Sequence, residues 1–223
     1  MTQARPADTI ARVAPADFFA RARARLTLEV PAGLTDPDII PRRGDHDIDP
    51  VMEAIAAVRP IKPAAVLVGV VEREQPTVLL TQRTTHLPDH AGQVAFPGGK
   101  IDAGDASPLA AALREAREEI GLDSALVEPV GYLELYMTTL GYRIVPVLAR
   151  VRPQFWLTLN EAEVESTFEV PLSFLMESAN HQRHSREWQG MTRSYYAIPF
   201  HERNIWGVTA GILRNLYERI YAE

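Results

Sequence analysis

Three glutamates lie within five positions of a segment that has the pattern of a helix. Glu115, Glu118 and Glu119 occupy positions i, i+3 and i+4 in the sequence FPGGKIDAGDASPLAAALREAREEIGL, residues 96–122. Side chains at this spacing project from one helix face, where like charges repel each other. Such a group is therefore either a solvated helix face or the carboxylate side of a cation site.

The residues around the helix favour the cation site. The Gly98–Gly99 turn lets the backbone approach a ligand closely, and Asp102 and Asp105 add carboxylates in the following loop. Hard oxygen ligands on a rigid helix beside such a loop suit Mg²⁺ or Mn²⁺, with phosphate oxygens completing the coordination. The solvated face remains the alternative, because Arg114 and Glu118 form an i, i+4 pair of the kind that decorates exposed helices.

The composition is that of an ordinary soluble globular protein. Of 223 residues, 46% are hydrophobic and 23% are charged, so the chain can bury the core of one large domain with extensions. Its formal net charge of −6 argues against a nucleic-acid partner, and an anionic substrate would need local Arg or Lys side chains or a metal ion. The absence of cysteine excludes disulfides and thiolate metal sites.

The sequence shows no pattern for membrane insertion or export. The longest apolar run, residues 63–71, is too short to cross a bilayer. The N-terminal residues lack the continuous apolar stretch of a secretory signal. Their arginines leave a transit peptide as the alternative, although Asp8 and Asp17 interrupt them. We therefore expect a cytoplasmic protein without a membrane partner.

The apolar pattern predicts one mixed α/β core preceded by an extension. Residues 1–60 contain two expected short helices, near 17–26 and 51–58, on either side of a stretch rich in Pro, Asp and Gly. The later segments are a hairpin over 64–83, a strand over 93–96, a helix from 108, β segments over 127–137 and 142–151, an irregular segment through 169, a short helix over 171–177, a hairpin over 181–198 that turns at 189–190, and an amphipathic helix over 205–221. We therefore divide the chain into an N-terminal extension, residues 1–60, and a core domain, residues 61–223.

The glutamate-bearing helix has clear start and stop signals. Ser107 is the expected N-cap, Pro108 the first helical residue and Gly121 the residue that closes the helix. The glutamates are expected on the side that faces solvent or metal. The side expected to face the core carries Leu109, Leu113, Ala116 and Ile120.

From Gly99 the sequence resembles the Nudix box, commonly written G-x5-E-x7-R-E-U-x-E-E-x-G-U, where U is aliphatic. The matching residues are Gly99, Arg114, Glu115, Glu118, Glu119, Gly121 and Leu122, with Ala116 at an aliphatic position. Asp105 stands where the box has Glu, and eight residues rather than seven separate it from Arg114. The resemblance implies the Nudix fold, a mixed β-sheet sandwiched between helices, and hydrolysis of a nucleoside diphosphate linked to another group.

The upstream sequence LLTQRTTHLPDHAGQVAFPGG, Leu79 to Gly99, resembles the signature of the coenzyme A pyrophosphatase branch of this family. Thr84 replaces a Ser of that signature, and Pro88 replaces an Arg. Further likenesses, GY…PV over 141–147 and WG.TAGI over 206–212, extend the resemblance to about residues 60–220.

The resemblance implies metal-dependent hydrolysis of coenzyme A or an acyl-CoA to 3′,5′-ADP and 4′-phosphopantetheine or its acyl derivative. Two alternatives stay open. Pro88 makes another substrate, such as ADP-ribose or NADH, a credible choice. A nucleotide-sensing domain without catalysis is the other, and the intact REAREE sequence argues against it. We expect a monomer or homodimer that acts on a small CoA-like nucleotide.

The resemblance also implies roles for the box residues. Glu115 and Glu119 are the leading metal ligands, and Glu118 ligates the ion or bridges to it through water. Arg114 would orient a glutamate through a charge-assisted hydrogen bond rather than touch the substrate. Main-chain atoms of Gly98 and Gly99 could complete the coordination.

The general base is left open between a box glutamate and an acid from a later loop. The sequence NEAEVESTFEVP offers Glu161, Glu163 and Glu165. Glu163 is favoured because an E-V pair at this place recurs in the family, with a solvated turn acid as the alternative. His86 and His90 could also transfer protons near neutral pH. We expect His90 instead to hold the signature loop in shape beside the substrate.

Two further groups of residues have expected roles. Arg83 and Lys100 are the candidate phosphate contacts, with ordinary surface positions as the alternative. Trp156, Trp188 and Trp206 are interpreted as core or hairpin packing residues rather than as residues that stack on adenine.

Overall fold

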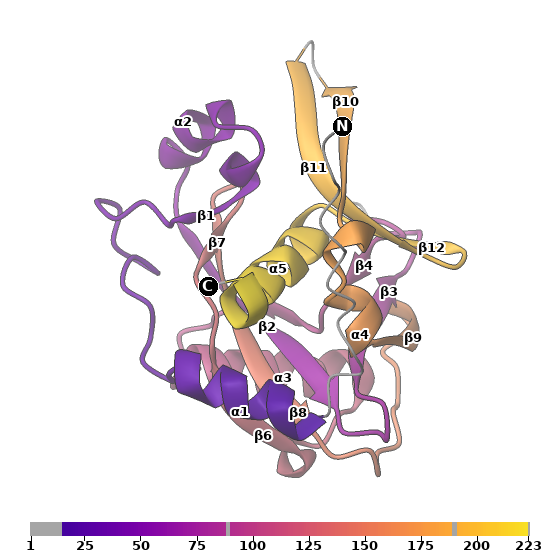
Figure 1. The fold of residues 1–223 in the computed structure, drawn as a ribbon. Coiled ribbons are helices and arrows are strands. Elements are labelled where there is room, and N and C mark those ends of the chain that lie inside the picture. Colours follow the sequence, from indigo (N-terminus) through magenta and orange to yellow (C-terminus); the bar gives the residue numbers. More distant parts are fainter. Residues whose placement is uncertain (1–14, 88–89, 189–190, 223) are drawn as a thin grey trace.

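The computed structural model describes residues 15–87, 90–188 and 191–222 (Figure 1). Its strands are β1 (Arg43–Gly44), β2 (Lys62–Val71), β3 (Thr77–Arg83), β4 (Val94–Ala95), β5 (Gly98–Lys100), β6 (Val127–Tyr132), β7 (Tyr136–Met137), β8 (Tyr142–Val151), β9 (Val164–Pro171), β10 (Gln182–Trp188), β11 (Met191–Phe200) and β12 (Arg203–Trp206). Its α-helices are α1 (Pro15–Arg25), α2 (Val51–Ala57), α3 (Pro108–Ile120), α4 (Leu172–Leu175) and α5 (Val208–Tyr217).

Within these residues, nine strands form one mixed sheet in the order β1-β7-β8-β2-β3-β4, with β5 paired to β2, β6 to β8 and β9 to β3. Strand β2 lies at its centre and runs parallel to β8 along its whole length, from Lys62 opposite Tyr142 to Val71 opposite Val151. A strand covered on both faces needs apolar residues on both sides, and β2 reads KPAAVLVGVV accordingly. Strands β10, β11 and β12 form a separate three-stranded sheet.

Helices cover both faces of the large sheet. Successive residues of a strand point to opposite faces, so Leu79 of β3 packs with α3 while Leu80 packs with α1 and α5. Figure 1 shows α1 and α5 in front of the sheet and α3 behind it. The expected mixed sheet between helices is therefore confirmed. No helix within the described residues is both long and apolar enough to span a bilayer.

The N-terminal segment packs against the same core. Phe18, Phe19 and Leu26 of α1 and its C-terminal end belong to the apolar layer that also contains α5. Strand β1 pairs with β7, and the buried Arg143 of β8 donates hydrogen bonds to the carbonyl oxygens of Gly33 and Asp36. The expected N-terminal helix is thus present as α1, and the domain division at residue 60 stays a prediction.

Three expected segments differ from the structure. Residues 164–169 are not irregular, because they pair with β3 as most of β9, and that partner is distant in sequence. Residues 127–137 form two short strands, β6 and β7, rather than one. Residues 205 and 206 belong to β12 and not to the last helix, which begins only after Gly207, whose φ is +63°. The expected turn at residues 189–190 lies outside the described residues.

Helix α3 begins and ends as expected. The Ser107 hydroxyl accepts a hydrogen bond from the Ala110 N–H at 3.1 Å, and Pro108 is the first helical residue. Gly121 closes the helix in the left-handed conformation, with φ +69°, and its N–H donates to the Arg117 carbonyl oxygen at 2.9 Å.

The buried face of α3 differs from the expected one. Leu109 and Leu113 are only partly buried, whereas Ala111, Ala112 and Glu119 are buried with Ala116 and Ile120. The three glutamates were expected to face solvent or a metal; Glu119 is 3% exposed and does not face solvent, so its place beside a metal stays a prediction. Glu119 is buried because it packs under the turn at Gly98, whose N–H donates to its carboxylate.

Replacing Gly121 by Ala should destabilise the protein. The new Cβ would stand 3.0 Å from the Thr158 amide nitrogen, and an L-residue would have to adopt the left-handed conformation. We expect the free energy of unfolding to fall by about 1–2 kcal/mol. Gly104→Ala is the matched control because a Cβ there meets no atom within 4 Å, and it should change stability by less than about 0.5 kcal/mol. Chemical denaturation measures both, and equal effects would contradict the assigned role of Gly121.

Candidate active site

The chain bends at Pro97, and Gly98 and Gly99 then begin β5. This segment, the Gly98–Gly99 turn, lies between β2 and α3 with no room for side chains. Strand β5 pairs antiparallel with β2, with Gly98 opposite Val66 and Gly99 opposite Ala65. A Cβ on Gly98, whose φ is +152°, would collide with the Ala65 carbonyl oxygen, and one on Gly99 would lie 2.6 Å from the Glu115 carboxylate. The glycines therefore allow the backbone to lie directly against the α3 carboxylates.

Glu119 is the most enclosed carboxylate of the group. Its Oε2 accepts a hydrogen bond from the Gly98 N–H at 3.1 Å, and its Oε1 lies 3.7 Å from Nη1 of Arg83. Burial raises the pKa of Glu119 to about 7, against the lowering effect of the Gly98 N–H and Arg83. The neighbouring charges of Glu115 and Glu163 raise it further. A cation at this place would therefore favour the ionised carboxylate.

Arg114 holds the carboxylates on the outer side of the turn. Its Nη1 donates to Glu115 at 3.0 Å and to Glu118 at 3.1 Å. Its Nε and Nη2 each donate to a different oxygen of Asp105 at 3.0 Å, and this bidentate contact lowers the pKa of Asp105. Nη2 also donates to the Lys100 carbonyl oxygen at 3.1 Å. The departure from the box at position 105 thus keeps an acid in contact with the box arginine.

Glu118 and Glu163 lie at the two margins of this group. The Glu118 side chain is 57% exposed and pairs with Arg114. Glu163 is partly buried, and its Oε1 accepts a hydrogen bond from Nδ2 of Asn160 at 3.2 Å. The charge of Glu163 raises the pKa of both Glu115 and Glu119, so the structure brings Glu163 close to the box. Glu161 is exposed, and Glu165 lines a different pocket.

Arg83 faces Glu119 with part of its hydrogen-bonding capacity unused. Its Nε is buried and has no hydrogen-bond partner among the described residues. The Arg83 N–H donates to the Gln93 carbonyl oxygen, and the next residue, Thr84, donates its N–H to the Glu163 carbonyl oxygen at 3.0 Å. These contacts hold the end of β3 beside both the signature loop and Glu163. An anionic group bound here would satisfy the guanidinium.

The other expected substrate contacts are less enclosed. Lys100 is exposed at the end of β5. His90 is also exposed, with φ +57°, and its Nδ1 lies 3.0 Å from Oε1 of Gln93. This contact within the signature loop agrees with a role in shaping it. His86 is exposed as well, and Pro88 lies outside the described residues.

The acids fit a hard divalent cation in their chemistry. Among the residues that the structure describes, no three acidic or histidine side chains are arranged to hold a metal as they stand. Burial and the neighbouring charge of Glu163 nevertheless raise the pKa of both Glu115 and Glu119, so several carboxylates share a half-buried site. A cation relieves that repulsion, and carboxylate oxygens are the ligands that Mg²⁺ and Mn²⁺ prefer.

The sequence analysis did not identify Asn160 as part of this region, and it assigned the wrong role to Trp156. Asn160 donates its N–H to the Glu119 carbonyl oxygen at 2.9 Å and its side chain to Glu163, and only its position before the acidic stretch pointed to it. The packing role expected for Trp156 is wrong, because this side chain is 95% exposed. Trp206 is partly buried and lines a pocket beside β3. Nothing is described of the Trp188 side chain.

Comparison with known proteins identifies the family. The sequence model of the NUDIX domain matches residues 60–189. A protein of Escherichia coli strain K12 and one of Shigella boydii serotype 4, both called "Uncharacterized Nudix hydrolase NudL", are each 41% identical over 153 residues, which is 69% of this chain and 80% of theirs.

Solved structures give weaker likenesses. A Caenorhabditis elegans Ap4A hydrolase has a TM-score of 0.43 and 22% identity over 49% of this chain and 80% of that chain. A MutT protein from Methanosarcina mazei has a TM-score of 0.43 and 20% identity over 53% of this chain and 83% of that chain. The family is shown by the domain match and by the relatives of 41% identity, without these structures. The chain belongs to the Nudix hydrolase family, whose members are pyrophosphatases that act on diphosphate anhydrides.

Proposed function

We propose that the protein hydrolyses the diphosphate of coenzyme A or an acyl-CoA with water, and that it yields 3′,5′-ADP and 4′-phosphopantetheine or its acyl derivative. The observation that carries the proposal is the contact between two sequence motifs. Arg83 and Gly98, from the stretch that resembles the coenzyme A signature, both contact Glu119 of the Nudix helix. Residues that could distinguish this substrate are thereby adjacent to residues that could act on its diphosphate.

Nudix hydrolases generally use divalent metal ions, and in this proposal Glu115 and Glu119 would hold Mg²⁺ or Mn²⁺. Glu118 would contribute directly or through water. The bound ion would neutralise charge on the phosphoryl oxygens. Arg114 positions Glu115 through its 3.0 Å hydrogen bond. The Arg83 guanidinium binds a phosphate oxygen, and its Nε lacks a partner in the described part of the chain.

Glu163 is the proposed general base. Asn160 donates to its Oε1 and leaves Oε2 available for the proton of the attacking water. Glu163 immediately precedes the buried Val164, which begins β9 and pairs with Arg83 of β3. The acid is thus the last residue of a turn and is followed at once by a paired strand.

A second candidate substrate, ADP-ribose or NADH, is favoured by Pro88, which stands where the coenzyme A signature has Arg. A proline lacks a guanidinium for phosphate recognition and restricts the backbone. The monomeric or homodimeric state and the cytoplasmic location stay predictions.

Glu119→Gln should remove activity without unfolding the protein. The amide oxygen can still accept the Gly98 hydrogen bond, but it supplies no negative charge for a metal. We expect kcat to fall about a hundredfold or more, the scale for loss of metal-held activation, and Mg²⁺ affinity to fall in calorimetric titration. Glu53→Gln, on the exposed side of α2, is the control and should leave both unchanged. Near wild-type turnover by a folded Glu119→Gln protein would contradict the metal assignment.

Glu163→Gln should separate catalysis from metal binding. If Glu163 takes the proton, its replacement should lower kcat about a hundredfold or more, while Mn²⁺ affinity, measured by titration, stays close to that of the wild type. The matched control is Glu161→Gln, an exposed acid in the same turn. A decrease in kcat of less than about threefold would return the role of base to a box glutamate.

A substrate panel tests the coenzyme A assignment itself. We expect CoA or a short acyl-CoA to have a higher kcat/KM than ADP-ribose or NADH with Mg²⁺ or Mn²⁺. Loss of one charge-assisted hydrogen bond costs about tenfold to a hundredfold in binding, so Pro88→Arg should lower the KM for CoA. If ADP-ribose or NADH exceeds CoA tenfold in kcat/KM, the proposed substrate is wrong although the family assignment stands.

A further inference from the structure

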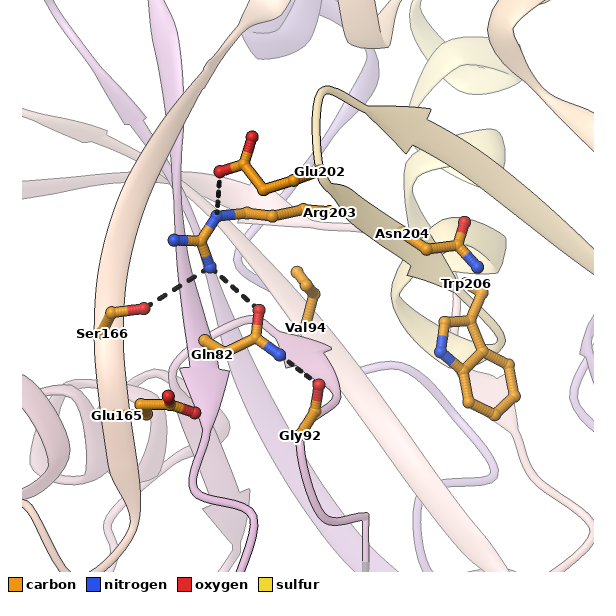
Figure 2. A pocket seen from close by; sticks show the side chains of 9 residues that line it. All are labelled: Gln82, Gly92, Val94, Glu165, Ser166, Glu202, Arg203, Asn204 and Trp206. Atoms are coloured by element: carbon orange, nitrogen blue, oxygen red, sulfur yellow. Dashed lines mark hydrogen bonds and ion pairs between the residues drawn. The ribbon is translucent and has the colours of Figure 1, made fainter.

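A second recess lies beside the candidate active site. It is an open pocket of about 420 Å³ where the ends of β3 and β9 meet β4 and the β11–β12 hairpin (Figure 2). Pockets of this size accommodate small molecules or parts of them. The lining residues that bear on its chemistry are Gln82, Glu165, Ser166, Glu202, Arg203 and Trp206.

Arg203 lines one side of the pocket, and its planar guanidinium is held in place by several contacts. Its Nη1 donates to Oε1 of Gln82 at 2.9 Å and to the hydroxyl of Ser166 at 3.4 Å. Its Cζ lies 4.0 Å from the centre of the Phe168 ring. The nearest carboxylate, on the largely exposed Glu202, is 3.8 Å away. The guanidinium is thus fixed mainly by neutral groups and by one aromatic ring, which leaves it able to stack on a second flat group.

Trp206 lies on the other side of the pocket in Figure 2. Its indole is supported by the Tyr195 ring, edge-on with centroids 5.5 Å apart, and by the Arg186 guanidinium 6.0 Å from its centre. The exposed Asn204 also lines the pocket and carries a side-chain amide. The pocket therefore combines two fixed planar surfaces with polar groups that can read a ring edge.

The charge of the lining favours a neutral ligand group. One guanidinium is set against the carboxylates of Glu165 and Glu202. A phosphate would meet net negative charge there, whereas a heteroaromatic ring would gain stacking on indole and guanidinium. A nucleobase has both the flat faces and the polar edges that this lining requires.

Adjacent residues of β3 contribute to the pocket and to the candidate active site. Gln82 lines the pocket and its neighbour Arg83 contacts Glu119, so the two sites lie on either side of one strand end. Ser166 of β9 is directly opposite Gln82, close in sequence to Glu163. We propose that this pocket binds the nucleobase of the substrate, with Arg203 and Trp206 as its specificity-determining residues. The identity of the nucleotide rests on the proposed function.

The test measures binding, without turnover. Calorimetric titrations would use adenosine 3′,5′-bisphosphate, which carries the base, and 4′-phosphopantetheine, which does not. We expect Arg203→Lys and Trp206→Leu each to weaken bisphosphate binding about tenfold, the scale of losing one base-stacking partner, and to leave phosphopantetheine binding unchanged. Arg73→Lys and Trp156→Leu are the matched controls. Arg73 also lies over a phenyl ring, Phe155, and Trp156 is exposed, and neither lines the pocket.

Three results would overturn the proposal: unchanged bisphosphate affinity in both folded variants, loss of phosphopantetheine binding instead, or no bisphosphate binding by a wild-type protein that hydrolyses CoA. Circular dichroism identifies a variant that fails to fold, and the second variant then decides. Failure of the proposed function has a different outcome. The wild type would then hydrolyse no CoA, while bisphosphate binding would still fall in the pocket variants.

Discussion

Glu119 is an ionisable side chain on the buried side of a helix, and one hydrogen bond from the Gly98 N–H makes that position tolerable. Burying a carboxylate without partners is costly, and the cost falls when backbone N–H groups and a guanidinium face it. Helix α3 can approach β2 and β5 this closely because its inner face carries the small residues Ala111, Ala112 and Ala116. The positions of Arg83, Glu115 and the turn all follow from that approach.

The close approach of α3 to β5 also limits the size of the side chains that fit between them. A side chain at Gly99 would occupy the space of the Glu115 carboxylate. Arg114 then holds Glu115 from outside and Asp105 holds Arg114 with two hydrogen bonds, so the loop and the helix form one charged network. The net effect is a row of acids kept together by a single arginine. This arrangement keeps the carboxylates oriented despite their mutual repulsion.

Local signals in the sequence predicted the elements whose causes are themselves local. Helix α3 begins after Ser107 and ends before Gly121, as the capping preferences of these residue types predict. Pro108 is its first residue. The sequence could not predict β9, because its pairing with β3 depends on a partner far along the chain. It also could not show that Glu119 is buried, since Glu118 and Glu119 look equivalent until Gly98 lies over one of them. Trp206 belonged to a motif in the sequence. That Arg203 and Gln82 line the same pocket could not be predicted, because it depends on how β12 and β3 lie in the fold.

The long parallel pairing of β2 with β8 has a consequence for how the chain acquires its structure. Lys62 finds its partner in Tyr142, and the whole Nudix box lies in the sequence between them. Pairings of such wide sequence separation form slowly, because closing the intervening loop costs entropy before any contact repays it. During synthesis on the ribosome, the box would emerge and α3 could coil while the strand that completes its supporting sheet is still missing. The order of emergence therefore makes the Gly98–Gly99 turn one of the later features to become rigid.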